Sequence, residues 1–252
     1  MEARTPPYDD GMRRLALLAL TAVSLAACSG TFGCQPQQVE PANDSLNLAA
    51  PTRASDVPDA KVITVAFLGD SLTAGLGLTQ QEAFPDRIQE LFAAEGYGEV
   101  DVLNGGVSGD TTAGGLRRVD QLIDPSTRVL VVALGGNDAL RGLSAGQTHD
   151  NVAAIVDDAL GKGLAVLVAG MQAPTNLGED YQASFRGAFE RISREYQGRI
   201  EYVPFLLEGV AGNPALNQAD GIHPTAEGAR IVAQLLYPKL RNIIDRMSNG
   251  AR

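Results

Sequence analysis

The sequence predicts an α/β fold in which three layers form an α/β/α sandwich around a five-stranded parallel sheet. Short apolar runs rich in Val, Ile and Leu alternate along the chain with stretches that have the spacing of helices. The apolar runs show little polar alternation, which is typical of strands buried on both faces. Strands joined through helices form right-handed crossovers, so the strands lie parallel and the helices cover both faces of the sheet.

The elements follow from the same two patterns. The five expected strands are Val62–Leu68, Val100–Leu103, Arg128–Leu134, Leu164–Ala169 and Ile200–Val203. The helices expected between them are Glu82–Glu95, Thr112–Ile123, Thr148–Leu160 and Tyr181–Tyr196. A last helix is expected from Ala226 to about Arg246, because Thr225 is a good N-cap residue. Residues 61–246 are therefore expected to form one domain, followed by a tail at 247–252.

Residues 1–27 have the composition of an export signal. Arg13 and Arg14 precede an apolar stretch that ends at Ala27 and is too short for a transmembrane helix of ~20 residues. The acidic segment 1–11 is unusual ahead of such a signal, and Met12 is an alternative start that gives a better basic region. We therefore expect the chain to be exported.

The apolar stretch ends in the string LAAC at residues 25–28, followed by Ser29 and Gly30. This string resembles the lipobox of bacterial lipoproteins, and the resemblance implies that Cys28 becomes the lipid-bearing first residue of the mature chain. The protein would then be a membrane lipoprotein of the bacterial cell envelope, facing the periplasm or the exterior. The alternative is an ordinary cleaved signal in which Cys28 is incidental.

Residues 28–60 are rich in Pro, Gln, Asn, Ala and Asp and have no apolar periodicity, so they are expected to form a flexible tether.

Both cysteines, Cys28 and Cys34, precede the domain. We therefore expect the domain to contain neither a disulfide nor a cysteine-based metal site. Lipidation of Cys28 would leave Cys34 as a lone thiol.

Composition argues against several classes of function. The formal net charge is −10 and the basic residues are scattered, so nucleic acid is not an expected partner. The two histidines, His149 and His223, do not lie at ligand spacing and the carboxylates are dispersed, so no metal site is expected. No glycine-rich phosphate loop follows the first strand, and no cofactor is expected.

Unusual residues gather where the expected strands end. Because the carboxyl ends of parallel strands meet at one edge of the sheet, segments far apart in sequence should converge there on one site. The four segments are Gly69–Ser71, Asn104–Thr111, Gly135–Asp138 and Asp220–His223.

A serine, a histidine and a carboxylate among these residues are the parts of an activated nucleophile. Ser71 is the expected nucleophile, and it needs a base at hydrogen-bond distance. His223 can both accept and return a proton near neutral pH, and Asp220 can orient its imidazole. The other histidine, His149, stands among Gln, Asp and Asn and is expected on the solvated surface.

The negative charge that develops on an attacked carbonyl needs hydrogen-bond donors. Gly109 offers a backbone N–H without a side chain in the way, Asn137 offers a side-chain amide, and the N–H of Ser71 is a third candidate. These three residues form the expected oxyanion hole.

The four segments together resemble the four sequence blocks of the SGNH, or GDSL-type, hydrolase family, over about residues 62–240. They resemble in particular the bacterial thioesterase I/protease I/lysophospholipase (arylesterase) group. The resemblance implies a flavodoxin-like SGNH hydrolase fold and identifies Ser71, Gly109, Asn137 and His223 as the four family-naming residues, with Asp220 completing the triad. It implies a serine esterase that hydrolyses acyl esters and thioesters, such as lysophospholipids or aryl esters, through an acyl-serine intermediate.

Other interpretations of the same residues stay open. Ser71 can instead cap a helix after a strand. Asp70, Asp110 and Asp138 are expected to hold their own loops rather than to act as a second catalytic acid. A carbohydrate O-acetylesterase of the cell envelope is an alternative enzyme, and a non-catalytic binding lipoprotein is an alternative of another class.

Overall fold

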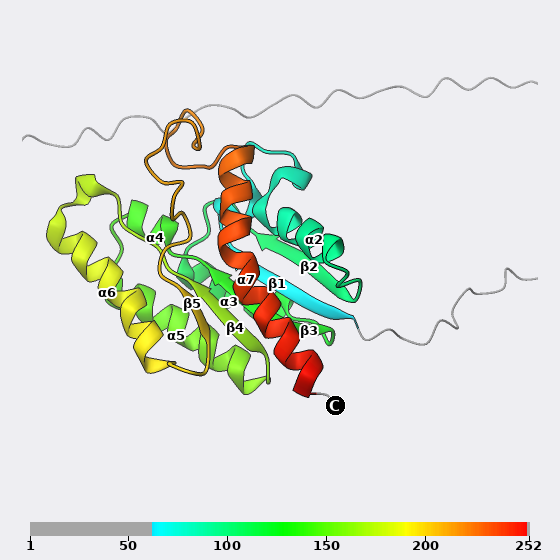
Figure 1. Ribbon diagram of the computed structural model, residues 1–252. Coiled ribbons are helices and arrows are strands. Elements are labelled where there is room, and N and C mark those ends of the chain that lie inside the picture. The colour runs from blue at the N-terminus through cyan, green and yellow to red at the C-terminus, as the bar shows by residue number, and fades with distance from the viewer. Residues whose placement is uncertain (1–61, 251–252) are drawn as a thin grey trace, which may run out of the picture. The chain divides into compact units, whose positions relative to one another are not determined.

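The structure, a computed structural model, describes residues 62–250, and the expected α/β/α sandwich with a five-stranded parallel sheet is confirmed (Figure 1). The strand order is β2-β1-β3-β4-β5 and every pairing is parallel. The expected export signal, lipid anchor and tether, at residues 1–27 and 28–60, lie outside the described residues. The strands are β1 (Ile63–Gly69), β2 (Val100–Gly106), β3 (Thr127–Ala133), β4 (Ala165–Ala169) and β5 (Glu201–Val203).

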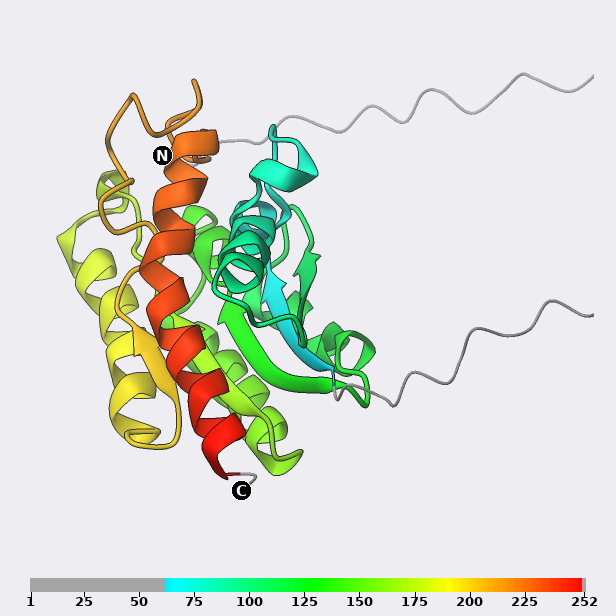
Figure 2. The ribbon, with the colours of Figure 1, turned by 45° about the vertical axis from the view of Figure 1, so that its right-hand side comes forward.

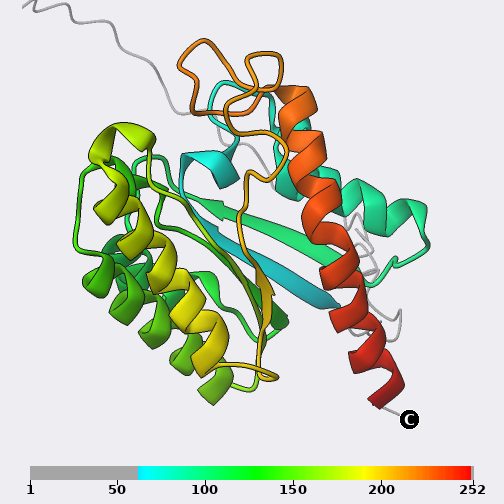
Figure 3. The ribbon, with the colours of Figure 1, turned by 60° about the vertical axis from the view of Figure 1, so that its left-hand side comes forward.

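Helices form the two outer layers. Helices α2 and α7 pack together on one face of the sheet, whereas α3, α5 and α6 pack together on the other (Figures 2 and 3). The helices are α1 (Ser71–Ala74), α2 (Phe84–Ala94), α3 (Thr112–Leu122), α4 (Gly136–Leu140), α5 (Ala145–Gly161), α6 (Glu179–Glu195) and α7 (Ala226–Gly250). Short 3₁₀ turns occur at Gln80–Glu82 and Thr175–Leu177.

The central strands carry the core. Residues 65–68 of β1 and 129–133 of β3 are at most 1% exposed, and side chains from both helical layers pack on them. This burial holds the carboxyl ends of β1 and β3 rigidly side by side, with Gly69 paired to Ala133.

Within residues 62–250, no helix has the length and apolarity needed to cross a bilayer.

The edge strand β2 departs from the expectation of strands buried on both faces. Asp101 is exposed and Leu103 is 37% exposed, whereas Val100 and Val102 pack on the core, because side chains alternate between the two faces of a strand. The sequence patterns ended this strand at Leu103, but it continues to Gly106, which pairs with Gly69. The longer strand brings the ends of β1 and β2 level at the edge that carries the polar loops.

The last helix is longer than the sequence pattern predicts. The last helix was expected to end near Arg246, with residues 247–252 as a tail, but α7 continues to Gly250. Ile243 and Ile244 are buried and Met247 packs against the core, so apolar contacts stabilise the additional turn. Residues 251–252 lie outside the described residues.

Candidate active site

Ser71 lies at the first position of α1, and only Asp70 separates it from the end of β1. The side chain of Asp70 caps this helix by accepting a hydrogen bond of 3.0 Å from the N–H of Leu72. The turn needs close backbone packing, because a Cβ on Gly106 would stand 2.2 Å from the nitrogen of Ala74. Glycine at the end of β2 therefore lets α1 sit against the sheet and present Ser71 at its carboxyl edge.

The structure brings Ser71, His223 and Asp220 together. His223 Nε2 lies 2.8 Å from Ser71 Oγ, and His223 Nδ1 lies 2.6 Å from Asp220 Oδ2. Because an ionised carboxylate can only accept, Nδ1 carries the proton and Nε2 is left free to accept one from Ser71. Serine and histidine are 152 residues apart in the chain, and the loop before α7 carries the imidazole back to the end of β1.

Asp220 is held in the geometry that orients the imidazole. Its Oδ1 accepts hydrogen bonds from the N–H groups of Ile222 (2.9 Å) and His223 (3.0 Å). The hydrogen bond from the His223 side chain, followed by these two from the backbone, lowers the pKa of Asp220 to about 2. The carboxylate is therefore ionised at neutral pH, when it can stabilise a protonated imidazole.

Asn137 lies in α4, after β3, and faces the nucleophile turn. Its Nδ2 donates to Asp70 Oδ2 at 3.2 Å. An amide nitrogen carries two protons, so this bond leaves one N–H for another acceptor. The contact joins the third polar segment to the first.

Gly109 lies in the loop after β2, with a positive φ of 82°. Arg141, which follows α4, donates to the carbonyl oxygen of Gly109 at 2.8 Å. The N–H of Val107 in the same loop donates to the carbonyl of Gly69 at 3.0 Å. The loop that carries Gly109 is thus bound both to the end of β1 and to the segment of Asn137.

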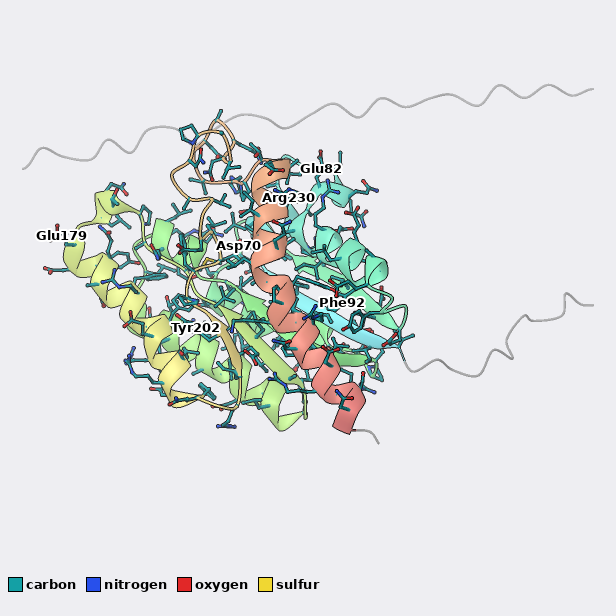
Figure 4. The ribbon with its side chains drawn as sticks, in the orientation of Figure 1. Asp70, Glu82, Phe92, Glu179, Tyr202 and Arg230 are labelled. Carbon is teal, nitrogen blue, oxygen red and sulfur yellow. The ribbon has the colours of Figure 1, made fainter. Side chains whose placement is uncertain are left out.

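Asp70, which is labelled in Figure 4, is buried, and only 1% of the residue is exposed. Burial raises the pKa of Asp70 to about 6, although the hydrogen bonds from Leu72 and Asn137 act in the opposite direction. The interpretation of Asp70 as a residue that binds local N–H groups agrees with the Leu72 contact, and the bond to Asn137 extends it to the neighbouring loop.

Asp70→Asn is expected to become more stable relative to the wild type as pH rises from 4 to 7. With a folded-state pKa above 3.8, Asp70 contributes stability that is complete below pH 3.8 and is lost as pH rises through about 6. Removing the ionisable group removes that loss, which amounts to about 2–3 kcal/mol between pH 4 and pH 7. Urea unfolding of both proteins at pH 4 and pH 7 measures it, and a difference that stays constant with pH would contradict the prediction.

Arg118 is a residue of the site that the sequence patterns missed. From α3, it donates to the carbonyl oxygens of Gly69 (2.7 Å) and Gly105 (2.8 Å) and to Asp110 Oδ2 (2.7 Å). Its side chain is only 19% exposed. One guanidinium thus binds the end of β1, the end of β2 and the residue after Gly109. The sequence offers no signal that separates Arg118 from the neighbouring Arg117 and Asp120 of the same helix.

Asp110 and Asp138 hold loops, as expected for structural carboxylates. Asp110 Oδ1 accepts from the N–H of Thr111 at 3.0 Å, in addition to the ion pair with Arg118. Asp138 accepts from the N–H (2.9 Å) and the hydroxyl (2.6 Å) of Thr112, and it is 2% exposed. These bonds tie the start of α3 to the segment of Asn137.

The expected surface position of His149 was wrong. The residue is 9% exposed, and its ring nitrogens lie 2.9 Å from Asp150 Oδ1 and 2.9 Å from Glu195 Oε2. It is covered because the end of α6 packs beside the start of α5, a contact that polar neighbours in the sequence do not reveal. His149 therefore serves the packing of two helices and lies apart from Ser71.

The arrangement can activate a hydroxyl for attack on an electrophilic carbonyl, since nucleophile, base and orienting carboxylate lie in line at hydrogen-bond distances. Within residues 62–250, no group of three or more His, Cys, Asp or Glu side chains is placed to hold a metal ion.

Comparison with known proteins finds a matching family model and similar hydrolases. The family model described as GDSL-like Lipase/Acylhydrolase family matches residues 67–231. Esterase TesA of Pseudomonas aeruginosa is 36% identical over 182 residues, which cover 72% of this chain and 89% of that protein. Thioesterase 1/protease 1/lysophospholipase L1 of Escherichia coli K12 is 30% identical over 186 residues, which cover 73% of this chain and 86% of that protein.

Solved structures of similar esterases superpose on this chain. The crystal structure of TesA superposes with a TM-score of 0.67 at 36% identity and covers 71% of this chain and 98% of its own. That of AlinE4, an esterase of the SGNH-hydrolase family, superposes with a TM-score of 0.59 at 37% identity and covers 72% of this chain and 96% of its own.

Proposed function

Since the chain belongs to the GDSL-like Lipase/Acylhydrolase family and is a serine ester hydrolase, we propose that Ser71, His223 and Asp220 carry out the hydrolysis. The observation that supports this assignment most strongly is the position of the His223 imidazole, which bridges Ser71 Oγ at 2.8 Å and Asp220 Oδ2 at 2.6 Å. The expected roles of nucleophile, base and orienting acid follow from these contacts.

In the first half of the reaction, Ser71 Oγ attacks the carbonyl carbon of the ester while its proton passes to His223 Nε2. The carbonyl oxygen becomes an oxyanion. His223 then returns the proton to the leaving alcohol or thiol as the bond to the acyl carbon breaks, and the acyl group remains on Ser71. Asp220 stays ionised throughout and stabilises the imidazolium.

We assign the oxyanion hole to the N–H groups of Ser71 and Gly109 and to the side-chain amide of Asn137. The second proton of Asn137 Nδ2 is free for this role, because the first is directed to Asp70. Each such donor typically contributes ~10²–10³ in turnover. The contacts of Arg118 and Arg141 with this region support a hole whose donors are positioned before substrate binds.

In the second half, a water molecule gives its proton to His223 Nε2 and attacks the acyl carbon. The tetrahedral intermediate collapses, the proton returns to Ser71 Oγ, and the carboxylic acid leaves. The two half-reactions together consume one ester and one water molecule and release one alcohol or thiol and one carboxylic acid.

The proposed substrates are acyl esters and thioesters, such as lysophospholipids and aryl or short- to medium-chain acyl esters. The names of the relatives, an esterase, an arylesterase and a thioesterase/lysophospholipase, support this class.

The test combines a fluorophosphonate probe with an ester screen. We expect the probe to label Ser71, located by mass spectrometry of the modified peptide, and we expect turnover of p-nitrophenyl esters and lysophospholipids above that of acetylated sugars. Labelling at another residue would overturn the triad. Turnover of acetylated sugars alone would overturn the acyl-ester proposal and favour the O-acetylesterase.

We further propose that the protein is a lipoprotein of the bacterial envelope, anchored through Cys28. Cys28→Ala is expected to abolish incorporation of labelled palmitate and to move the protein from the membrane to the soluble fraction. Cys34→Ala is the matched control, because it removes the other cysteine and should leave both properties intact. Palmitate incorporation that persists in Cys28→Ala would contradict the anchor.

A further inference from the structure

Large apolar side chains are exposed around the candidate active site. Among residues 62–250, seven such side chains are strongly exposed, and five of them lie on loops or short helices at the carboxyl edge of the sheet. We refer to these five as the apolar rim: Leu76 (48% exposed), Val107 (48%), Leu140 (47%), Leu143 (38%) and Ile222 (40%). The other two are Val62, which directly precedes β1, and Leu103, which lies on the edge strand β2.

Backbone hydrogen bonds place the rim beside the reacting groups. The N–H of Leu76 donates to the carbonyl of Ser71 at 3.0 Å. The N–H of Ile222 donates to the carboxylate of Asp220 at 2.9 Å. Val107 is bound in the same way to Gly69, at 3.0 Å. Three separate loops thus each present one apolar side chain next to the site.

The remaining two rim residues follow Asn137. Leu140 lies in α4, and the N–H of Leu143 donates to the carbonyl of Asp138 at 2.9 Å. The hydroxyl of Tyr181 donates to the carbonyl of Leu143 at 2.8 Å, which ties this turn to α6. These hydrogen bonds place both leucines beside the segment of Asn137.

Two charged side chains beside the rim have partners within the protein. Asp220 is paired with His223, and Arg141 donates to the carbonyl of Gly109. An exposed apolar cluster next to a hydrolytic site is typical of a surface that meets another apolar phase. The net charge of −10 opposes attraction to anionic lipid, so a zwitterionic lipid surface is the favoured occupant.

The chain before the domain has the length that such docking needs. Ile63 starts β1 at the end of the sheet opposite the rim (Figure 1), and the seven residues of β1 span about 23 Å. The roughly 34 residues between Cys28 and β1 can span at most about 120 Å. A domain anchored at Cys28 can therefore turn its far edge onto the same membrane.

We propose that the apolar rim docks onto a zwitterionic lipid surface, and that the enzyme takes acyl-ester substrate directly from it. This inference rests on the proposed function, because the docked surface surrounds the proposed Ser71 nucleophile.

The test compares two substrates with the full-length chain. One is lysophosphatidylcholine at low mole fraction in phosphatidylcholine vesicles, and the other is soluble p-nitrophenyl acetate. The rim variant is Leu76→Ser with Leu143→Ser, whose side chains are exposed and can be replaced without disturbing the core. We expect its rate on the vesicle-borne ester, divided by its rate on the soluble ester, to fall at least about tenfold.

The matched control is Val62→Ser with Leu103→Ser, which removes similarly exposed apolar side chains away from the rim. It should leave both rates within about twofold of the parent. All variants carry the same amino-terminal segment, so a difference between them reports on the rim. Leu76→Phe with Leu143→Phe enlarges the apolar surface and should raise the rate on the vesicle-borne ester as well as the rate ratio, a gain that misfolding cannot produce.

Each negative result has a distinct meaning. An unchanged rate ratio in the serine variant, or an equal fall in the control, would overturn docking by the rim. A parent that is dimeric in sedimentation velocity and a rim variant that is monomeric would also overturn it, because a second copy would then be the occupant. A parent that hydrolyses neither ester would instead overturn the proposed function.

Discussion

Ser71→Ala is expected to lower kcat for p-nitrophenyl ester hydrolysis by about 10⁴- to 10⁶-fold. The reason is that the hydroxyl is the only group of this residue that can form the acyl intermediate, and no neighbouring nucleophile replaces it. The rate that remains would come from water attack assisted by the oxyanion donors. Steady-state kinetics gives kcat, and the fluorophosphonate probe should no longer label the protein.

The fold should be unaffected, because Ser71 Oγ makes its side-chain hydrogen bond to His223, whereas the cap of α1 comes from Asp70. The thermal melting temperature should therefore stay within a few degrees of the wild type. Ser184→Ala, on the exposed face of α6, is the matched control and should keep full activity. A Ser71→Ala protein that turns over ester at wild-type rates would show that Ser71 is only the first residue of a helix.

His223→Ala is expected to cause a loss of similar size, about 10⁴- to 10⁶-fold in kcat. Without the imidazole, Ser71 has no base within hydrogen-bond distance, and a neutral serine hydroxyl is a weak nucleophile. The rate of fluorophosphonate labelling should fall with kcat, because both reactions need the same activated oxygen. The rate constant of labelling is obtained from a single-exponential fit for the wild type and for the variant. Their ratio measures the loss without depending on how the ester substrate binds.

His149→Ala is the matched control, because it removes the only other histidine of the chain. His149 contacts Asp150 and Glu195, so its loss should lower the melting temperature while kcat stays close to wild type. A variant at His149 that loses activity as strongly as His223→Ala, with its fold intact, would contradict the assignment of the base.

Asp220 stays ionised far below neutral pH. Its lowered pKa means that its interaction with His223 contributes stability that is present above pH 3.8 and is lost as pH falls through about 2. Protonation of Asp220 therefore cannot explain a loss of activity between pH 5 and 7.

The order of strands and helices was predictable because each element is encoded by residues close together in the chain. Unbroken apolar runs indicated β1 and β3, and the glycines and polar residues that follow them indicated the turns at the sheet edge. The element ends were less accurate. Helix α5 begins at Ala145 because Ser144 caps it, three residues before the expected Thr148, and β2 continues to Gly106 because β1 pairs with it there.

The sequence by itself therefore determined the fold class and the residue types available for chemistry at the carboxyl edge of the sheet. Only the tertiary structure decided which of them meet. The contact of Arg118 with Gly69 joins residues 49 positions apart, and that of Asn137 with Asp70 joins residues 67 positions apart. The burial of His149 depends likewise on how α6 packs against α5. Such contacts depend on the packing of whole helices against the sheet, and periodicity and turn chemistry describe only neighbours along the chain.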